Sequence, residues 1–311
     1  MAGAVIHRFA YDDLRRFAVA LGTAAGLAPA RSGAMAAHLL WFDAAGAPSL
    51  GIATLDTWLT SIDERRVDAS ATGRITGERS AAADLDGENG LPLLVLERAA
   101  EVAVEKARDS GVGLVRVVGI APAASAAPIA AGIAIGPMTA WVLGPGGAWS
   151  LALPTAAGLP LVVDPGLPAA EARASGKPAS ADPAGGRASA QTRARAPASR
   201  RPERTPAPDF PEGMRLAAEV LVPEGGWLVA ALAGTGPDSL SAWHERVATA
   251  RERSAAAAAD AGARRHVLDP EGWEARRRRL WQEGVEVASP AWKPLVRRAS
   301  GPAIEPPAPL D

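Results

Sequence analysis

The spacing of apolar and polar residues predicts a group of amphipathic helices at the start of the chain. Apolar residues recur there every three or four positions, which is the period of a helix with one buried face. Asp12 and Asp13 open the first segment, where acidic side chains suit the positive end of a helix dipole. Residues 46–51 are rich in glycine and proline and predict a turn. The helices are expected over residues 12–25, 31–45 and 54–65.

The middle of the chain predicts a helix packed on a sheet. Residues 73–86 are typical of two short strands or a hairpin. Between Asn89 and Gly111, charged side chains recur every three or four residues on one helical face, and apolar side chains form the other face. The charged residues are Glu97, Glu101, Glu105 and Arg108, and the apolar residues are Val95, Ala99, Val102 and Ala103. Asn89 is a candidate cap for the start of this helix, and Gly111 is expected to end it in the left-handed conformation. A buried strand over residues 113–118 follows.

The loop after that strand is the first place to look for chemistry, because α/β proteins place functional groups at the carboxyl ends of strands. Residues 119–125 read Gly-Ile-Ala-Pro-Ala-Ala-Ser. None of these side chains exchanges a proton near neutral pH. The loop therefore stands in a catalytic position without a catalytic group.

A stretch of 47 residues without charge, residues 117–163, is long enough for a membrane span. Prolines and glycines divide it into pieces shorter than the roughly 18 apolar residues that a spanning helix needs. We interpret it as buried strands and a short helix. The helix is expected over residues 129–135, and the strands over residues 138–143, 149–153 and 160–163.

Composition changes at residue 168. Ala, Pro, Ser, Gly and Arg dominate residues 168–213, which predicts a flexible linker. The domain prediction is one discontinuous α/β domain, residues 1–167 and 214–311, interrupted by this linker. Beyond it, ordered elements are expected at residues 216–222, 227–232, 240–261, 271–282 and 291–298, with a frayed proline-rich tail from Gly301.

Composition and charge exclude several classes of function. The chain of 311 residues has no cysteine, which excludes disulfides, thiolate zinc sites and cysteine nucleophiles. A net charge of −1 provides no global attraction to nucleic acid or to acidic membranes. The first residues lack the apolar core of a signal peptide, so a cytoplasmic location is expected.

The order of several motifs resembles the malate/L-lactate dehydrogenase-like oxidoreductases, a family separate from the classical Rossmann lactate dehydrogenases. It includes ureidoglycolate and sulfolactate dehydrogenases and reductases of cyclic imino acids. The resemblance implies an α/β fold with a mixed sheet, flanking helices and non-classical NAD(P) binding. It also implies NAD or NADP as cofactor and a homodimer. The motifs are residues 12–27, Ser49-Leu50-Gly51, residues 86–91 and 101–117, the set Gly176, Pro178, Asp182 and Pro183, and residues 273–295.

The working residues of that family are missing. Ile120 stands where the resemblance places the proton-transferring histidine of an Asn-His-Phe-Gly loop, and Leu50 replaces the histidine of a Ser-His-Gly turn. A Gly-Thr-Asn-Pro segment is absent after Gly146 and Gly147, and a Lys-Gly-Tyr-Gly helix start has no counterpart. Isoleucine and leucine cannot take the role of histidine, which titrates near neutral pH. The resemblance therefore implies an oxidoreductase impaired or inactive in hydride transfer.

Other candidate sites are weaker. Gly144, Gly146 and Gly147 could present backbone amides to a phosphate, but no lysine follows, so a plain turn is favoured. Residues 84–89 resemble a calcium loop, yet the twelfth position is Val95, and a solvated turn is favoured. We predict no metal site. The four histidines are scattered: His7, His38, His244 and His266.

Three functions remain open from the sequence. The first is a non-catalytic or impaired homologue with a binding or structural role. The second is an active oxidoreductase on a 2-oxo, 2-hydroxy or cyclic imino acid with relocated chemistry, using Asp164 or Asp86. Asp164 ends a strand, although capping the turn into Pro165 is the favoured role. The third is an adaptor that binds nucleic acid or an acidic protein through the basic linker. The linker lacks interleaved aromatics, which disfavours nucleic acid. Its arginines are Arg187, Arg193, Arg195, Arg200, Arg201 and Arg204.

Overall fold

The computed structural model describes residues 5–167, 222, 225–233, 239–260 and 266–310. Several predicted features lie outside the described residues. They are the linker with its arginines, the motif from Gly176 to Pro183 and most of the element expected at residues 216–222. The division into one discontinuous domain and a linker therefore stays a prediction.

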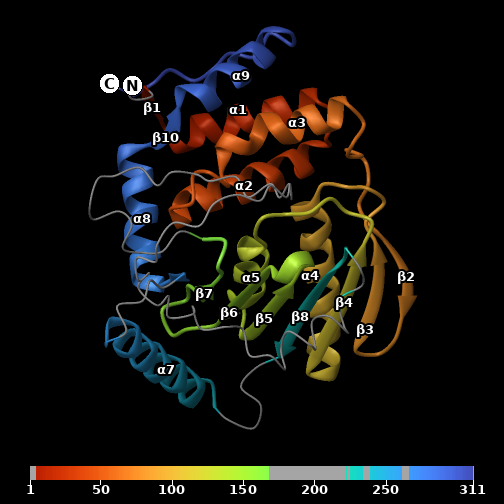
Figure 1. Ribbon diagram of the computed structural model, residues 1–311, viewed down its shortest axis with the longest axis vertical. Coiled ribbons are helices and arrows are strands. Elements are labelled where there is room, and N and C mark those ends of the chain that lie inside the picture. The colour runs from red at the N-terminus through yellow and green to blue at the C-terminus, as the bar shows by residue number, and fades with distance from the viewer. Residues whose placement is uncertain (1–4, 168–221, 223–224, 234–238, 261–265, 311) are drawn as a thin grey trace, which may run out of the picture.

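The predicted N-terminal helices are confirmed and form a helical layer, at the top of Figure 1. Their buried faces meet in one apolar cluster that includes Leu14, Phe17 and Leu39. Trp292 of the last helix enters the same cluster, with its ring centroid 5.3 Å from that of Phe17. The helices are α1 (Tyr11–Ala24), α2 (Pro29–Ala45), α3 (Leu55–Asp63) and α9 (Ser289–Ser300), with the short 3-10 helix η1 (Ile52–Thr54) before α3.

Two short strands that the sequence did not predict close this layer. β1 (Ile6–Phe9) pairs antiparallel with β10 (Val285–Ala288). The expected fraying of the tail from Gly301 is wrong, because the backbone N–H of Leu310 donates to the carbonyl of Arg8 at 2.7 Å. The first strand and the last described residues accordingly lie side by side (Figure 1).

The second layer is a mixed eight-stranded sheet in the order β2-β3-β4-β8-β5-β6-β7-β9. β3 and β4 are parallel, and every other neighbouring pair is antiparallel. The uncharged stretch supplies β5, β6 and β7 of this sheet, as predicted. No helix among the described residues is long and apolar enough to cross a bilayer. The strands are β2 (Arg74–Glu78), β3 (Ala82–Asp86), β4 (Val112–Val118), β5 (Met138–Leu143), β6 (Trp149–Leu153), β7 (Leu161–Val163), β8 (Trp227–Ala233) and β9 (Val267–Leu268).

Helices α4 (Pro92–Ser110) and α5 (Ala127–Ala134) pack on the sheet, with α4 over β4 and β8 and α5 over β5 and β6 (Figure 1). The approach of α4 is close: a β-carbon on Gly113 would lie 1.8 Å from the carbonyl oxygen of Ala103. β4 forms where the buried strand was predicted, and it is buried on alternate residues, at Gly113, Val115 and Val117. Its outward face carries the exposed Arg116.

The ends of α4 confirm one prediction and correct another. Gly111 ends the helix with φ 77°, as expected. Asn89 does not cap it, because the helix begins at Pro92 and the capping position is Leu91. Asn89 instead adopts φ 59° and donates from its side-chain amide to the carbonyl of Arg66 at 2.8 Å. The asparagine therefore stabilises the turn before the helix.

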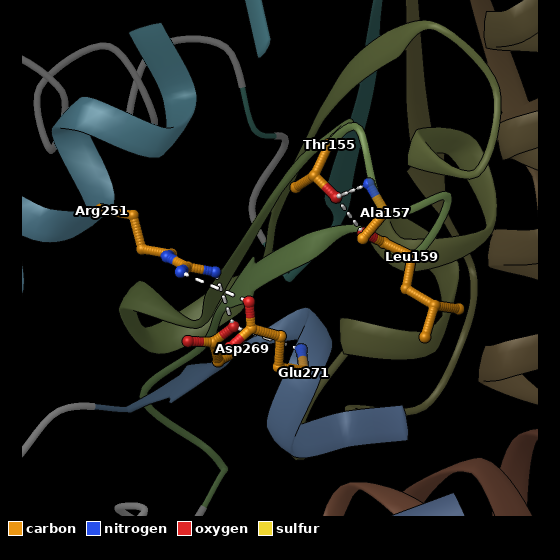
Figure 2. A network of polar contacts seen from close by, with 6 residues as sticks. All are labelled: Thr155, Ala157, Leu159, Arg251, Asp269 and Glu271. Carbon is orange, nitrogen blue, oxygen red and sulfur yellow. Dashed lines mark hydrogen bonds and ion pairs between the residues drawn. The ribbon is translucent and has the colours of Figure 1, made fainter. Parts of the chain in front are cut away.

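Helix α8 (Pro270–Glu283) runs along one side of the molecule, from the sheet up to the helical layer, and α7 (Leu240–Asp260) lies near its start (Figure 1). Asp269 caps α8 by accepting from the backbone N–H of Glu271 at 3.3 Å. Arg251 of α7 donates to the same carboxylate at 3.0 Å (Figure 2). The four successive arginines from Arg276 to Arg279 are typical of a solvated helix face. Arg276 departs from this pattern, because it is half-buried and donates to the carbonyl of Ala45 at 2.7 Å.

Candidate functional site

The loop after β4 is bound tightly to the turn that precedes α4. The N–H of Gly87 donates to the carbonyl of Val118 at 2.8 Å, and the N–H of Asn89 donates to that of Gly119 at 2.7 Å. The half-buried Ile120 packs against the core of the sheet layer. Its Cγ2 methyl lies 2.2 Å from where a β-carbon on Gly87 would stand. An apolar side chain thus fills the position at which the resemblance places a histidine.

The turn after α2 is organised by the buried carboxylate of Asp43. Its Oδ2 accepts from the backbone N–H of Ile52 at 2.9 Å. A β-carbon on Gly51 would lie 2.4 Å from both carboxylate oxygens, so only glycine fits there. Leu50, just before it, is half-buried against the same sheet core as Ile120.

A cavity of about 630 Å³ adjoins this turn. Ser49 and Ile52 line the cavity, whereas Leu50 and Ile120 do not. Its other walls come from β1, α8 and β10, and they carry charged side chains of both signs. Leu50 and Ile120 therefore contribute to the core rather than to this cavity.

Asp164 is 2% exposed at the end of β7, and both of its oxygens accept hydrogen bonds. Oδ2 accepts from the hydroxyls of Ser125 at 2.7 Å and Ser150 at 2.5 Å. Oδ1 accepts from the N–H of Gly166 at 2.6 Å, which confirms the predicted capping role. Burial nevertheless raises the pKa of Asp164 above the ordinary value of aspartate, against the opposing effect of these hydrogen bonds.

The two serines were missed by sequence reasoning, although a signal existed. Ser150 falls on the buried side of an alternating strand, where Ala152 is its buried neighbour. A serine at such a position needs a hydrogen-bond partner. Its partner could not be identified without the fold, because Asp164 is 14 residues away.

The candidate phosphate loop is a tight connection between β5 and β6. The N–H of Gly144 donates to the carbonyl of Ala148 at 2.7 Å, and a β-carbon on Gly144 would lie 2.5 Å from the Trp227 ring. Gly146 and Gly147 are exposed and have φ values of 69° and 80°. These glycines are therefore explained by the geometry of the turn.

The histidines lie elsewhere and are not clustered. His7 Nε2 lies 2.8 Å from the Ser289 hydroxyl, and His266 Nδ1 lies 2.6 Å from the carbonyl of Leu167. His38 Nε2 lies 3.3 Å from a carboxylate oxygen of Glu97, an interaction that lowers the pKa of Glu97. His244 is on α7.

No group of three or more potential metal ligands occurs among the described residues. In the turn that resembles a calcium loop, the Asp84 carboxylate accepts from the Arg116 guanidinium at 2.5 Å. Asp86 Oδ1 accepts from the N–H of Glu88 at 3.0 Å. These contacts fit the favoured interpretation of a turn.

Comparison with known proteins places this geometry in context. Residues 9–139 match the sequence model of the malate/L-lactate dehydrogenase family. Comparison with curated protein sequences gives no significant match.

Solved structures share the fold over nearly the whole chain. Malate dehydrogenase from Pyrococcus horikoshii OT3 has a TM-score of 0.71 and 17% identity, covering 98% of this chain and 99% of that one. Sulfolactate dehydrogenase from Methanocaldococcus jannaschii has a TM-score of 0.64 and 17% identity, covering 96% and 98%. Delta1-piperideine-2-carboxylate reductase from Pseudomonas syringae has a TM-score of 0.64 and 16% identity, covering 94% and 99%. The predicted malate/lactate dehydrogenase-like α/β fold is confirmed.

Proposed function

We propose that this chain is a divergent member of the malate/L-lactate dehydrogenase family, whose sequence model matches residues 9–139. In this proposal it does not transfer hydride and has a binding or structural role. One observation carries the proposal. Ile120 packs against Gly87 and the sheet core in a loop closed by backbone hydrogen bonds. General acid–base catalysis needs a titratable group within hydrogen-bond reach of the reacting atom, and this side chain has none.

Relocation of the chemistry to another acid is the rival proposal. A raised pKa would make Asp164 a better proton carrier near neutral pH. Its side chain is buried, however, and both oxygens are occupied by internal donors. Asp86 lies in a turn and accepts from the backbone of Glu88. Both acids therefore have structural partners, which favours loss of the reaction over relocation.

The family suggests NAD or NADP as cofactor, and the turn at Gly144, the weak candidate for phosphate binding, fits a phosphate poorly. A phosphate cradle needs backbone N–H groups that are free to point at the ligand. The N–H of Gly144 is used by Ala148, and its Cα face is covered by Trp227. We therefore assign no step of a mechanism to a nicotinamide cofactor.

Two further proposals concern the oligomeric state and the basic linker. By resemblance to the family we propose a homodimer, which sedimentation velocity tests. The basic-linker adaptor stays a prediction about residues outside those described. Binding to random DNA that does not weaken between low and physiological salt would exclude an electrostatic mode for it.

The experiment is a fluorescence titration with NADH and NADPH, combined with NADH oxidation assays on pyruvate, oxaloacetate and a cyclic imino acid. We expect no turnover. Micromolar binding accompanied by turnover of any of these substrates would overturn the proposal. In that case Asp164→Asn identifies the rival mechanism if it abolishes turnover while Asp109→Asn, at an exposed aspartate, does not.

A further inference from the structure

A second cavity, of about 370 Å³, lies between α2, α5 and α8. Its walls are aromatic: Tyr11, the only tyrosine of the chain, meets Trp41, Trp273 and Trp281 there. Small-molecule sites commonly have volumes of about 300–1,000 Å³ and apolar, aromatic walls with a few polar groups. Trp281 is 54% exposed, so one wall opens to solvent.

The aromatic walls are held in fixed arrangements. The rings of Tyr11 and Trp281 stack at 4.6 Å between centroids with an interplanar angle of 29°. Those of Trp41 and Trp273 meet edge to face at 5.4 Å. Such pairs lose little conformational freedom when a further flat ring packs against them.

The remaining wall is also ordered. Leu159 lines the cavity from the β6–β7 turn, and the hydroxyl of Thr155 donates to its carbonyl at 2.6 Å (Figure 2). Helix α8 carries Trp273 near its start and Trp281 near its end. Its start is fixed by the Asp269 cap and by Arg251 (Figure 2).

The charge at the cavity is positive. Arg277 lines it, with its guanidinium carbon 5.9 Å from the centroid of the Trp273 ring. The guanidinium has one long ion pair, 3.9 Å to Glu274, and its side chain is 44% exposed. No aspartate or glutamate is among the described residues that line the cavity.

We propose that this cavity binds a planar aromatic anion of the aryl carboxylate class. The flat ring packs against the tryptophan and tyrosine walls, and the carboxylate pairs with the Arg277 guanidinium. A guanidinium held near an aromatic ring suits this ligand because it pairs with the carboxylate in a planar, bidentate geometry. The inference is independent of the loss of hydride transfer, since none of its residues belongs to the loops discussed above.

The test is isothermal titration calorimetry of the full chain with 2-naphthoate and with its neutral isostere 2-naphthamide. We expect saturable one-site binding of naphthoate and about tenfold weaker binding of the amide, as for the loss of one charge-assisted hydrogen bond. Trp281→Ala removes a wall and should weaken both ligands. Arg277→Gln should abolish the preference for naphthoate.

The matched controls are Arg278→Gln and Trp243→Ala. Arg278 is the adjacent arginine, pairs with the same Glu274 at 3.2 Å and does not line the cavity. Trp243 lies on α7. Neither control should change the affinity for naphthoate. The proposal is overturned by absence of saturable binding, or by equal effects of Arg277→Gln and Arg278→Gln. It is also overturned if Trp281→Ala dissociates a dimer without changing the affinity for naphthoate, because the aromatic face would then be an interface between copies.

Discussion

The Cγ2 methyl of Ile120 occupies space that a side chain on Gly87 would need, at 2.2 Å from the ideal β-carbon position. The φ of Gly87 lies outside the left-handed region, so the requirement for glycine is one of space rather than of backbone conformation. The two loops that flank the expected histidine position are therefore matched to each other through an apolar contact.

Gly87→Ala should lower the free energy of unfolding by about 1–3 kcal/mol, the usual cost of overpacking. Ile120→Ala in the same chain should recover part of this loss, because it removes the clashing methyl. Urea unfolding of the two single variants and the double variant measures the coupling. Gly33→Ala is the control, since a β-carbon there meets nothing within 4 Å. Additive effects of Gly87→Ala and Ile120→Ala would contradict the contact.

The variant Leu50→His/Ile120→His should lower the melting temperature and should not produce NADH oxidation. Each half-buried apolar side chain contributes on the order of 1 kcal/mol, and each imidazole would need a polar partner that the sheet core does not supply. Differential scanning fluorimetry and the three-substrate assay test both statements. Leu310→His, at an exposed leucine, is the control. Unchanged stability together with turnover would show that a functional site survives.

The stability contributed by Asp164 should fall as pH rises. Burial raises its pKa in the folded state, so above the unfolded value of 3.8 the folded protein holds this proton more tightly than the unfolded chain. The folded state then carries more protons, and stability decreases with pH until the folded pKa is passed. Asp164→Asn removes this dependence.

Urea unfolding of the wild type and of Asp164→Asn from about pH 4 to pH 8 isolates the effect, because the carboxylates with lowered pKa values are common to both proteins. The stability of the wild type relative to the variant should decline across the lower part of this range. A difference that stays constant with pH would show that the pKa of Asp164 is not raised.

Arg298 joins α9 to α3 and should be a strong stability determinant. Its guanidinium donates to Asp56 at 3.1 Å, to the hydroxyl of Thr60 at 2.9 Å and to Asp63. Arg298→Ala should cost about 1–3 kcal/mol, and Arg298→Lys should recover only part, because lysine lacks the planar fork. Arg297→Ala, at the exposed neighbour, should have little effect in the same chemical denaturation series. Equal losses for the two arginines would contradict this assignment.

Elements with a strong local pattern could be predicted from the sequence. Helices α1 to α4 have clear apolar faces, and the middle strands are bounded by glycine and proline. β1, β9 and β10 could not, because each is two to four residues long and is defined by its partner. β1 and β10 pair across almost the whole chain, and no local pattern reveals such a contact.

Some features of the candidate site could also be predicted from the sequence, and others required the fold. The apolar identity of residues 50 and 120 is visible in the sequence, as is the turn at Asp164. The burial of Asp164 against Ser125 and Ser150 depends on strand order, which the sequence left open. The aromatic cavity was also not predicted. Tyr11 and Trp281 lie far apart in the sequence. Their stacking depends on the packing of α8 beside the helical layer, which the sequence does not reveal.

The pairing of β1 with β10 also sets an order of events for folding. His7 and Ser289, which are in contact, are 282 positions apart. Phe9 packs on Trp292 with 4.2 Å between ring centroids, so part of the apolar face of the first helices is covered only when the last helix is made. During synthesis on the ribosome, that part of the apolar face is exposed to solvent until the last helix is made. Exposed apolar surface binds chaperones and promotes aggregation with other nascent chains. Completion of the helical layer is thus a late, long-range closure, of the kind that slows folding.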